Sequence, residues 1–465
     1  MNIPDPNYRR RKHGCDQSDR PRSRKIDAEE FSREFFALLG DEKNISDRFK
    51  GQLVEKPIRR LRKLIEALLQ YGRPDEDVCH TLVISNGGTL MGADGGGGIA
   101  MQGDIEQRFD DLNIHESVLR EVKLCFYELF NADSILMNMP FWRVNAVVIA
   151  MIKKYVPHLV DAILVGHGSD TKHIGAANTV WMLPNLDKPL TFVGALAEDG
   201  AEVEDAPQNV TGALLASIVG ARDGISEVMM SCSPANRQVI RAVNAAYVDG
   251  KRGYESCAGT EPLLDWSAFT PGESKLKKLS FRKGAKRKGR TNKKFEPHIL
   301  PSKTGREGIV SHPNIVVLDP TLMSREAMEH HIQVGPCVVI RTSHASVVND
   351  DVAEFLFEMW HAGKILCLLT ETTGTQSSPE QYVEGNELDV TLQKGVPFGA
   401  ITDVAALTKL THALARFDVC PTNDVDYGPV VDRKTQRKVH AFMRKNEARE
   451  WVWQHKPKKK ASTNK

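Results

Sequence analysis

Short apolar runs, each followed by a turn rich in glycine or polar side chains, constrain the fold of this chain more than any other feature. We predict four of them as strands: Thr81–Ser85, Ala162–Val165, Leu190–Val193 and Glu227–Met230. Patterns with helical spacing lie between them at Asn145–Tyr155, Ala176–Leu183 and Gln208–Val219. This alternation predicts an α/β fold built on a parallel sheet, with reactive groups at the carboxyl ends of the strands.

A second unit with the same alternation follows a segment rich in Lys, Arg and Gly. Its predicted strands and helices are Ile315–Leu318, Cys337–Ile340, Ile365–Leu369, Val352–Trp360 and Val404–Leu414. We therefore expect a larger N-terminal domain, with a parallel-type sheet covered by helices on both faces, and a smaller C-terminal α/β domain. The expected boundaries are a basic, unstructured tail at 1–25, a helical extension at 26–75, the first domain at 76–272, a basic linker or insertion at 273–308, the second domain at 309–420 and a helical, Lys-rich tail at 421–465.

The helical extension has the signals of two helices. Asp27 is placed to cap a helix that carries Phe31, Phe35 and Leu38 and stops near Gly40. The second helix has one apolar stripe, formed by Ile58, Leu61, Ile65 and Leu68. We expect this segment to pack on the first domain or to form an oligomer contact.

Composition places the chain among globular proteins with a sizeable core. It has 465 residues, of which 41% are hydrophobic and 26% charged. No apolar run reaches the length of a transmembrane helix and the N-terminus lacks the apolar stretch of a secretory signal, so we expect neither. Eight cysteines are scattered without a C-x-x-C pair. This pattern argues against a zinc ribbon or a disulfide framework, and it predicts reduced thiols in a cytoplasm-like compartment.

Positive charge is concentrated in three segments, although the net charge is only +2. The segments are 1–25, 275–306 and 456–465, and the rest of the chain is acidic. Lys and Arg runs of this kind bind phosphates in a salt-dependent way, which favours RNA or another polyanion as a partner. A solvated linker and tails, or a localisation signal, explain the same runs, and the sequence leaves both interpretations open.

The first chemical motif follows the strand Thr81–Ser85 and reads Asn-Gly-Gly-Thr-Leu-Met-Gly over residues 86–92. Glycines let the backbone turn sharply, and Thr89 then carries a hydroxyl to the end of the sheet. A hydroxyl beside backbone N–H groups has the parts needed to attack a carbonyl and stabilise its oxyanion. A tight turn without chemistry is the competing interpretation, and the motif fits neither a P-loop nor a dinucleotide fingerprint.

The second motif follows the strand Ala162–Val165 and reads Gly-His-Gly-Ser-Asp-Thr over residues 166–171. It places the hydroxyl of Ser169 and the carboxylate of Asp170 next to each other where a helix begins. An N-cap for that helix is the competing interpretation.

The two motifs, in this order and about 80 residues apart, resemble the bacterial-type L-asparaginase family, closest to its cytoplasmic type I branch. The resemblance extends to Lys188–Ala195, to the helix with Asn209 and Ala213, and to Leu369–Leu410 in the second unit. It covers roughly residues 80–272 and 309–415. It implies a two-domain asparaginase fold, a homo-oligomer, no cofactor or metal, and hydrolysis of L-asparagine or a related side-chain amide to the acid and ammonia.

The resemblance assigns roles residue by residue. Thr89 matches the threonine nucleophile, and Ser169 with Asp170 matches the Thr-Asp pair of the family. Arg241 falls where the family has a lysine, and Lys172 and Lys251 are nearby in sequence. Because arginine essentially never loses its proton, Arg241 is a poor general base but can still orient a carboxylate. The expected substrate-binding positions are Gly88, Gly168 and Asn138.

Three departures from the family pattern affect substrate binding. Ile99 lies nearest the position of a flap tyrosine, the substrate-binding turn reads Leu136-Met137-Asn138 without a charge, and a loop that normally carries asparagine reads Thr-Ser-His-Ala-Ser at 342–346. They put free asparagine as the substrate in question. The alternative function is therefore a catalytically impaired relative that binds RNA or assembles with other molecules.

Overall fold

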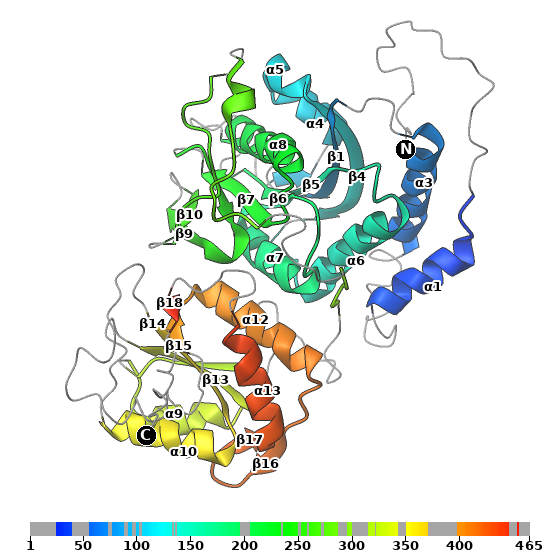
Figure 1. Cartoon of the computed structure of the whole chain (residues 1–465). Helices are drawn as coiled ribbons and strands as arrows, with labels where there is room; N and C mark the ends of the chain where they lie inside the picture. The colour runs from blue at the N-terminus through cyan, green and yellow to red at the C-terminus, as the bar shows by residue number, and fades with distance from the viewer. Residues whose placement is uncertain are drawn as a thin grey trace, which may run out of the picture.

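A computed structural model describes residues 25–39, 55–72, 77–87, 92–94, 99–101, 105–132, 134, 137–195, 205–233, 236–249, 253–257, 260–270, 274–286, 295–299, 315–320, 322–342, 350–370, 398–445 and 453–454. They form two α/β domains that meet along one side (Figure 1). The predicted fold class, a larger N-terminal domain with a mostly parallel sheet and a smaller C-terminal α/β domain, is confirmed.

The larger domain is built on a seven-stranded sheet with the order β11-β8-β7-β6-β5-β1-β4. Its strands are β1 (Cys79–Gly87), β4 (Val122–Ala132), β5 (Ala162–Gly166), β6 (Leu190–Val193), β7 (Val228–Ser233), β8 (Gln238–Arg241) and β11 (Leu264–Asp265). From β4 to β7 all neighbours are parallel, and β8 runs antiparallel to β7. The carboxyl ends of the five parallel strands therefore share one edge of the sheet, which we term the carboxyl edge.

Alternate residues of each strand point to opposite faces of this sheet, and a different group of helices covers each face. Leu82 and Ile84 of β1 pack with α1 (Ala28–Leu39), α3 (Lys56–Tyr71), α6 (Met139–Tyr155) and α7 (Ser169–Met182). Val83 packs on the other face with α4 (Ile105–Asp111), α5 (Glu116–Leu119) and α8 (Ala206–Asp223). Continuous burial on both faces explains why these strands are apolar runs without alternation.

The N-terminal helices extend the first of these two faces. As predicted, Asp27 caps α1, because its side chain accepts a hydrogen bond from the backbone N–H of Glu30 at 2.8 Å. The apolar stripe of α3 is buried, and the hydroxyl of Tyr127 on β4 donates to the carbonyl of Pro57 at 2.9 Å. These contacts place the extension beside the edge strand β4 (Figure 1).

The smaller domain has a five-stranded sheet with the order β12-β13-β14-β15-β18. Its strands are β12 (Ile315–Leu318), β13 (Cys337–Thr342), β14 (Ile365–Thr370), β15 (Phe398–Ala400) and β18 (Trp453–Gln454), the last antiparallel to the others. Helices α9 (Arg325–Ile332) and α10 (Asp350–Ala362) cover one face, and α12 (Asp403–Arg416) and α13 (Arg433–Met443) cover the other. The α12 face also contacts α7, so the two domains share a core cluster there.

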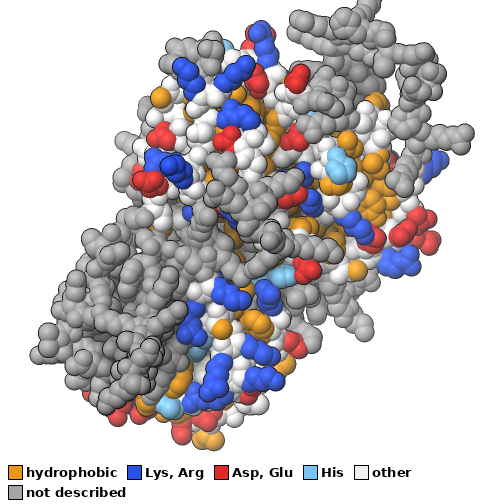
Figure 2. Space-filling view, in the orientation of Figure 1, with side chains coloured by type: hydrophobic (Ala, Val, Ile, Leu, Met, Phe, Trp, Pro, Cys, Tyr) orange, Lys and Arg blue, Asp and Glu red, His pale blue; other side chains and the backbone are white. Residues whose placement is uncertain are grey.

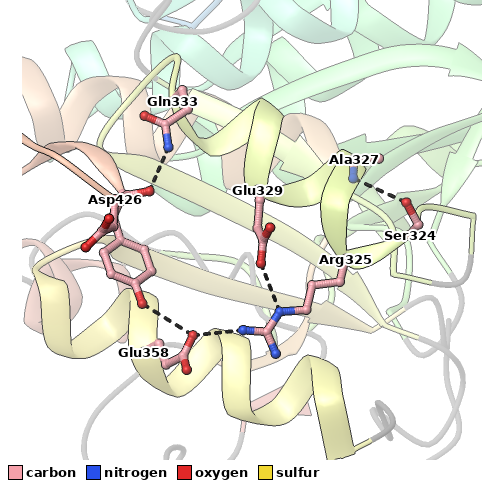
Figure 3. A network of polar contacts seen from close by, with 8 residues as sticks. Ser324, Arg325, Ala327, Glu329, Gln333, Glu358 and Asp426 are labelled. Carbon is pink, nitrogen blue, oxygen red and sulfur yellow. Dashed lines mark hydrogen bonds and ion pairs between the residues drawn. The ribbon is translucent and has the colours of Figure 1, made fainter.

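A polar network on the surface of the smaller domain holds α9 in place (Figure 3). Arg325 pairs with Glu329 at 2.9 Å and with Glu358 of α10 at 3.1 Å. The hydroxyl of Tyr427, in the turn between β16 (Thr422–Asp424) and β17 (Gly428–Val430), donates to Glu358 at 3.3 Å. One carboxylate thus joins α9, α10 and the β16–β17 hairpin.

Two parts of the chain pack more tightly than the sequence suggests. Phe281 and Ala285, within the expected linker 273–308, are buried in the core of the larger domain. Phe442 and Met443 of α13, within the expected tail 421–465, are buried in the core of the smaller domain. The composition of these two segments does not predict their burial, because a few apolar residues are sufficient to anchor a segment whose other side chains are charged. The sequence prediction also missed β4, which contains three charged or amide side chains, Lys123, Glu128 and Asn131.

Candidate functional site

The end of β1 forms one wall of the candidate site at the carboxyl edge. Gly87 has a φ of 87°, a conformation that favours glycine, so the chain leaves the strand in a sharp turn. The side chain of Asn86 is buried, and its Oδ1 atom has no hydrogen-bond partner among the described residues. The predicted nucleophile Thr89 and the predicted binding residue Gly88 follow directly in sequence, but both lie outside the described residues.

The first turn of α7 forms the second wall. β5 pairs with β1 so that Gly166 lies opposite Ser85, which brings the turn after β5 next to the turn after β1. Gly168 is the N-cap residue of α7 and has no side chain to occupy that position. Ser169 and Asp170 begin the helix, half-buried and exposed respectively. Both predicted residues therefore face the edge at which the first motif also ends.

The loop between β4 and α6 joins this group. The hydroxyl of Ser134 donates to Oδ2 of Asp170 at 3.2 Å, and the backbone oxygen of Ser134 accepts from the hydroxyl of Thr171 at 2.7 Å. Asn138 is the N-cap residue of α6, but its side chain makes no capping bond and its buried Oδ1 atom has no partner in the described structure. The sequence prediction missed Ser134, because an isolated serine in a loop carries no pattern.

Lys172 is the charged group buried closest to this site. Its side chain is 0% exposed, although lysine almost never lies fully inside a protein without a partner. The Nζ atom donates a long hydrogen bond of 3.4 Å to the carbonyl of Gly194 at the end of β6, and it lies 5.6 Å from the centre of the Tyr254 ring. No carboxylate of the described residues lies within ion-pair distance of this ammonium group. The cluster therefore holds one buried positive charge.

Two histidines flank Lys172 and are neutral near pH 7. The indole N–H of Trp142 donates to Nε2 of His167 at 3.3 Å, so the Nδ1–H of His167 donates to the carbonyl of Gly168 at 3.0 Å. Burial lowers the pKa of His167 to about 4, against this backbone bond, and the charge of Lys172 adds to the effect. Burial and Lys172 likewise lower the pKa of His173 to about 4.

Tyr254 of β10 (Gly253–Ser256) links these groups. Its hydroxyl donates to the carbonyl of Ser169 at 2.9 Å, and its oxygen lies 2.9 Å from Nδ1 of His173. Since the single hydroxyl proton is used by Ser169, the Nδ1–H of His173 is the donor in the second bond. The β9–β10 hairpin thereby supports the helix turn that carries Ser169.

The structure corrects the expectation that Arg241 lies beside Asp170. β8 returns antiparallel to β7 and pairs Arg241 with Met229, near the beginning of β7 rather than at its carboxyl end. The guanidinium group donates to the carboxylate of Glu227 at 3.0 Å and to the carbonyl of Gly284 at 3.1 Å, and the pair is almost fully buried. The local motif matches the family pattern, but the short β7–β8 hairpin carries Arg241 away from the carboxyl edge.

The structure gives less information on the remaining predicted positions. Ile99 lies in the short strand β3 (Ile99–Met101), which pairs with β2 (Gly92–Asp94), and residues 343–346 and Lys251 lie outside the described residues. Within the described ranges no group of three His, Cys, Asp or Glu side chains is arranged to hold a metal ion. No described helix combines the length and apolar character needed to span a membrane.

Comparison with known proteins supports the family resemblance. Residues 80–252 match the family described as "Asparaginase, N-terminal". The chain superposes on the thermostable L-asparaginase from Thermococcus kodakarensis with a TM-score of 0.61 and 19% identity, covering 80% of this chain and 99% of that one. For L-asparaginase I from Vibrio cholerae O1 biovar eltor str. N16961 the TM-score is 0.60 and the identity 20%, with the same coverage. No curated protein sequence matches significantly. At these identities the structural likeness shows the fold.

Proposed function

We propose that this chain, a member of the bacterial-type L-asparaginase family by its residues 80–252 and by its fold, hydrolyses a side-chain amide such as that of L-asparagine to the acid and ammonia. The observation that carries the proposal is the polar group at the carboxyl edge. There Asp170 and Ser169 begin a helix beside the turn that precedes Thr89. Parallel α/β sheets bind ligands at this edge.

In the proposed reaction the hydroxyl of Thr89 attacks the amide carbon of the substrate. The hydroxyl proton passes to the leaving nitrogen, the carbon–nitrogen bond breaks, and ammonia and an acyl-enzyme ester result. Water then attacks the ester, returns a proton to Thr89 and releases the acid. The carboxylate of Asp170, held by Ser134, is positioned to orient Ser169 or the attacking water.

Lys172, rather than Arg241, supplies the positive charge of the proposed site. Its ammonium group is buried and lies in the same helical turn as Asp170. A cation there attracts negative charge at the carboxyl edge, either on a substrate carboxylate or on the carbonyl oxygen during attack. The buried acceptors of Asn86 and Asn138 are the groups available to bind an ammonium or amide N–H.

Ammonia release from L-asparagine and L-glutamine tests the proposal. We expect activity in the wild type and its loss, by at least about 100-fold, in Thr89→Ala and Lys172→Met. Arg241→Lys is the matched control and is expected to keep wild-type activity, because that side chain lies away from the carboxyl edge. Full activity in Thr89→Ala would end the mechanism, and a gain of activity in Arg241→Lys would return that residue to the site.

The proposal includes two expectations from the resemblance, namely an oligomer of identical chains and a cytoplasmic location. The apolar stripe of α3 is turned toward the larger domain, so an oligomer contact has to use other surfaces. Light scattering coupled to size-exclusion chromatography gives the number of chains, and a monomer at all concentrations would remove the first expectation.

A second candidate function, binding of RNA or another polyanion, is favoured by the surface of α13. Lys and Arg side chains gather over this helix in Figure 2. Lys434, Arg437 and Lys438 are exposed on it, and the first turn holds no acidic residue. A labelled single-stranded RNA titrated at several salt concentrations tests this function. Replacing the three side chains with Gln is expected to reduce the salt slope by about 0.9 for each lost phosphate contact.

The matched control replaces Lys277, Lys278 and Lys283, three exposed lysines of the basic segment, with Gln. Substitution is preferable to deletion of the basic segment 275–306, because Phe281 and Ala285 of this segment are part of the core and their loss would destabilise the fold. Weaker binding in the α13 variant alone places the contact on that helix. Binding that both variants leave unchanged, or that does not depend on salt, would exclude this function for the two surfaces.

A further inference from the structure

A cavity of about 150 Å³ lies at the junction of the two domains. The turn Leu183–Leu186, which follows α7, and Glu227, which precedes β7, line it from the larger domain. His412 and Arg416 of α12 and Phe442 of α13 line it from the smaller domain. Because its walls include the residues that lead into β6 and β7, the cavity is at the opposite edge of the sheet from the proposed amidase site. A cavity of this size holds a molecule about as large as benzene.

The described residues that line the cavity carry more positive than negative charge. Glu227 is the acidic residue in its lining, and its carboxylate accepts from the guanidinium of Arg241 at 3.0 Å and from the backbone N–H of Lys286 at 2.7 Å. The Arg241–Glu227 pair is therefore neutral as a unit. Lys286 and Arg416 add two further positive charges to the same wall.

Arg416 is the cation best placed to meet a ligand. Its guanidinium carbon lies 5.4 Å from the centre of the Phe442 ring and 5.9 Å from that of Phe417, and the side chain is exposed. In the described part of the chain no carboxylate lies within ion-pair distance of it. Both distances are within the range of a cation–π interaction, which favours this position of the exposed guanidinium group.

Two imidazoles complete the polar wall. The rings of His298 and His412 are stacked, with centres 5.8 Å apart and an angle of 14° between their planes. Burial lowers the pKa of His412 to about 3, and the neighbouring His298 and Arg416 act in the same direction. His412 is thus neutral near pH 7 and offers one N–H donor and one acceptor.

The basic segment 273–308 is what holds part of this wall in place. The backbone N–H of His298 donates to the carbonyl of Met182 at the end of α7 at 2.7 Å. The carbonyl of Lys286 accepts from the backbone N–H of Ser226 at 2.9 Å. Both side chains are therefore presented by backbone that is anchored to the larger domain.

We propose that this cavity binds a small oxyanion, held by Arg416 and the imidazole of His412 from the smaller domain and by Lys286 from the larger one. Charge-assisted hydrogen bonds from an arginine fork and an N–H suit phosphate and carboxylate oxygens alike. The volume excludes a nucleotide and admits inorganic phosphate or a short carboxylic acid. The bound anion joins the two domains, so it stabilises their arrangement.

Thermal unfolding in inorganic phosphate and in malonate, at constant ionic strength set with chloride, tests this proposal. We expect the Tm to rise and to saturate with one of the two anions, as required for a ligand that binds only the folded state. Arg416→Gln and Lys286→Gln are expected to raise the apparent Kd at least tenfold. Arg59→Gln, exposed on α3 and outside both proposed binding surfaces, is the matched control and should leave the Kd unchanged.

Each outcome of these measurements supports or overturns the proposed anion site. The anion that saturates at the lower concentration identifies the source of the oxyanion, phosphate or carboxylate. A Tm that rises without saturation, or a Kd equal in wild type, Arg416→Gln and Lys286→Gln, overturns the proposal. Proton NMR of the histidine C2–H signals gives a second measurement, and the His412 signal, assigned with His412→Asn, must shift on titration. Thr89→Ala should bind the anion normally, so failure of the amidase proposal is distinguishable.

Discussion

The two edges of the main sheet differ in how their charged groups are compensated. At the carboxyl edge Lys172 is buried with one long bond to the carbonyl of Gly194, and the carboxylate of Asp170 faces solvent. At the opposite edge Arg241 and Glu227 are buried together and satisfy each other. An uncompensated buried charge is unfavourable, and proteins keep such groups mainly where they are used. The comparison therefore supports the proposal that places the chemistry at the carboxyl edge, where no carboxylate of the described residues pairs with Lys172.

Helix α7 connects the two edges. Its first turn carries Ser169 and Asp170, and its last turns place Trp181 in the junction with the smaller domain. There the indole N–H of Trp181 donates to the hydroxyl of Thr408 at 3.1 Å. Helix α7 thus links the domain junction directly to the candidate site. The Arg241–Glu227 pair lies on a neighbouring strand and is not part of this helix.

The largest expected effect comes from Gly194, at the carboxyl edge. A Cβ atom at this position would collide with the backbone oxygen of His167 and would also lie 3.2 Å from Nζ of Lys172. We expect Gly194→Ala to lower the free energy of unfolding by about 3 kcal/mol or more, since backbone has to move. Urea denaturation measures this. Gly284→Ala is the matched control, because a Cβ there meets no atom within 4 Å. Equal stability of the two variants would contradict the packing described.

The second effect tests the ion pair at the opposite edge. Glu227→Gln leaves the buried charge of Arg241 without its carboxylate partner and is expected to cost about 2 kcal/mol, less than for a fully enclosed pair because the adjacent cavity admits water. The double variant Glu227→Gln with Arg241→Met should recover most of this loss. Amidase activity per folded molecule should stay unchanged in both. A selective loss of activity without loss of stability would show that the edges are coupled.

The third effect is a dependence of stability on pH. In the folded protein the pKa of His167 is about 4, against an ordinary value of 6.5. The unfolded chain therefore binds more protons between pH 4 and 6.5, so stability is fully present above pH 6.5 and is lost as the pH falls toward 4. Protonation would also turn Nε2 into a donor facing the donor of Trp142.

We expect His167→Gln to reduce the slope of unfolding free energy against pH in this window by about 1.4 kcal/mol per pH unit, the value for one proton. Urea denaturation at several pH values between about 4.5 and 7 measures this slope. An unchanged slope would mean that folding does not lower the pKa of His167, and the description of this imidazole as neutral would have to be revised.

Much of the architecture was predictable from local patterns. The apolar runs predicted β5 and β6 to within one residue, and the glycine turn predicted after Thr81–Ser85 matches a positive φ at Gly87, the last residue of β1. Ser169 and Asp170 could be proposed as site residues from the sequence because their motif is contiguous. The contacts of Ser134 with Asp170 and of Lys172 with Gly194 could not be predicted in this way, since each joins two segments that are far apart in the sequence.

Arg241 shows the limit of motif reasoning most directly. The resemblance placed it in the catalytic set on the basis of neighbouring residues, yet strand register decides where a side chain points. The hairpin between β7 and β8 pairs Arg241 with Met229, and this pairing depends on the length of a turn rather than on the identity of the arginine. The burial of Phe281 within a strongly basic segment is a similar case.

The sequence by itself determined the strand–turn–helix alternation, the two-domain division and the motifs at the carboxyl ends of the strands, because period, glycine and apolar runs act locally. Only the tertiary structure decided which charges are paired. Lys172 is buried beside Gly194, Arg241 is matched by Glu227, and a cavity between the domains collects Lys286, His412 and Arg416. Electrostatic partners are set by distance in space and by burial, and neither quantity is encoded at any single position of the chain.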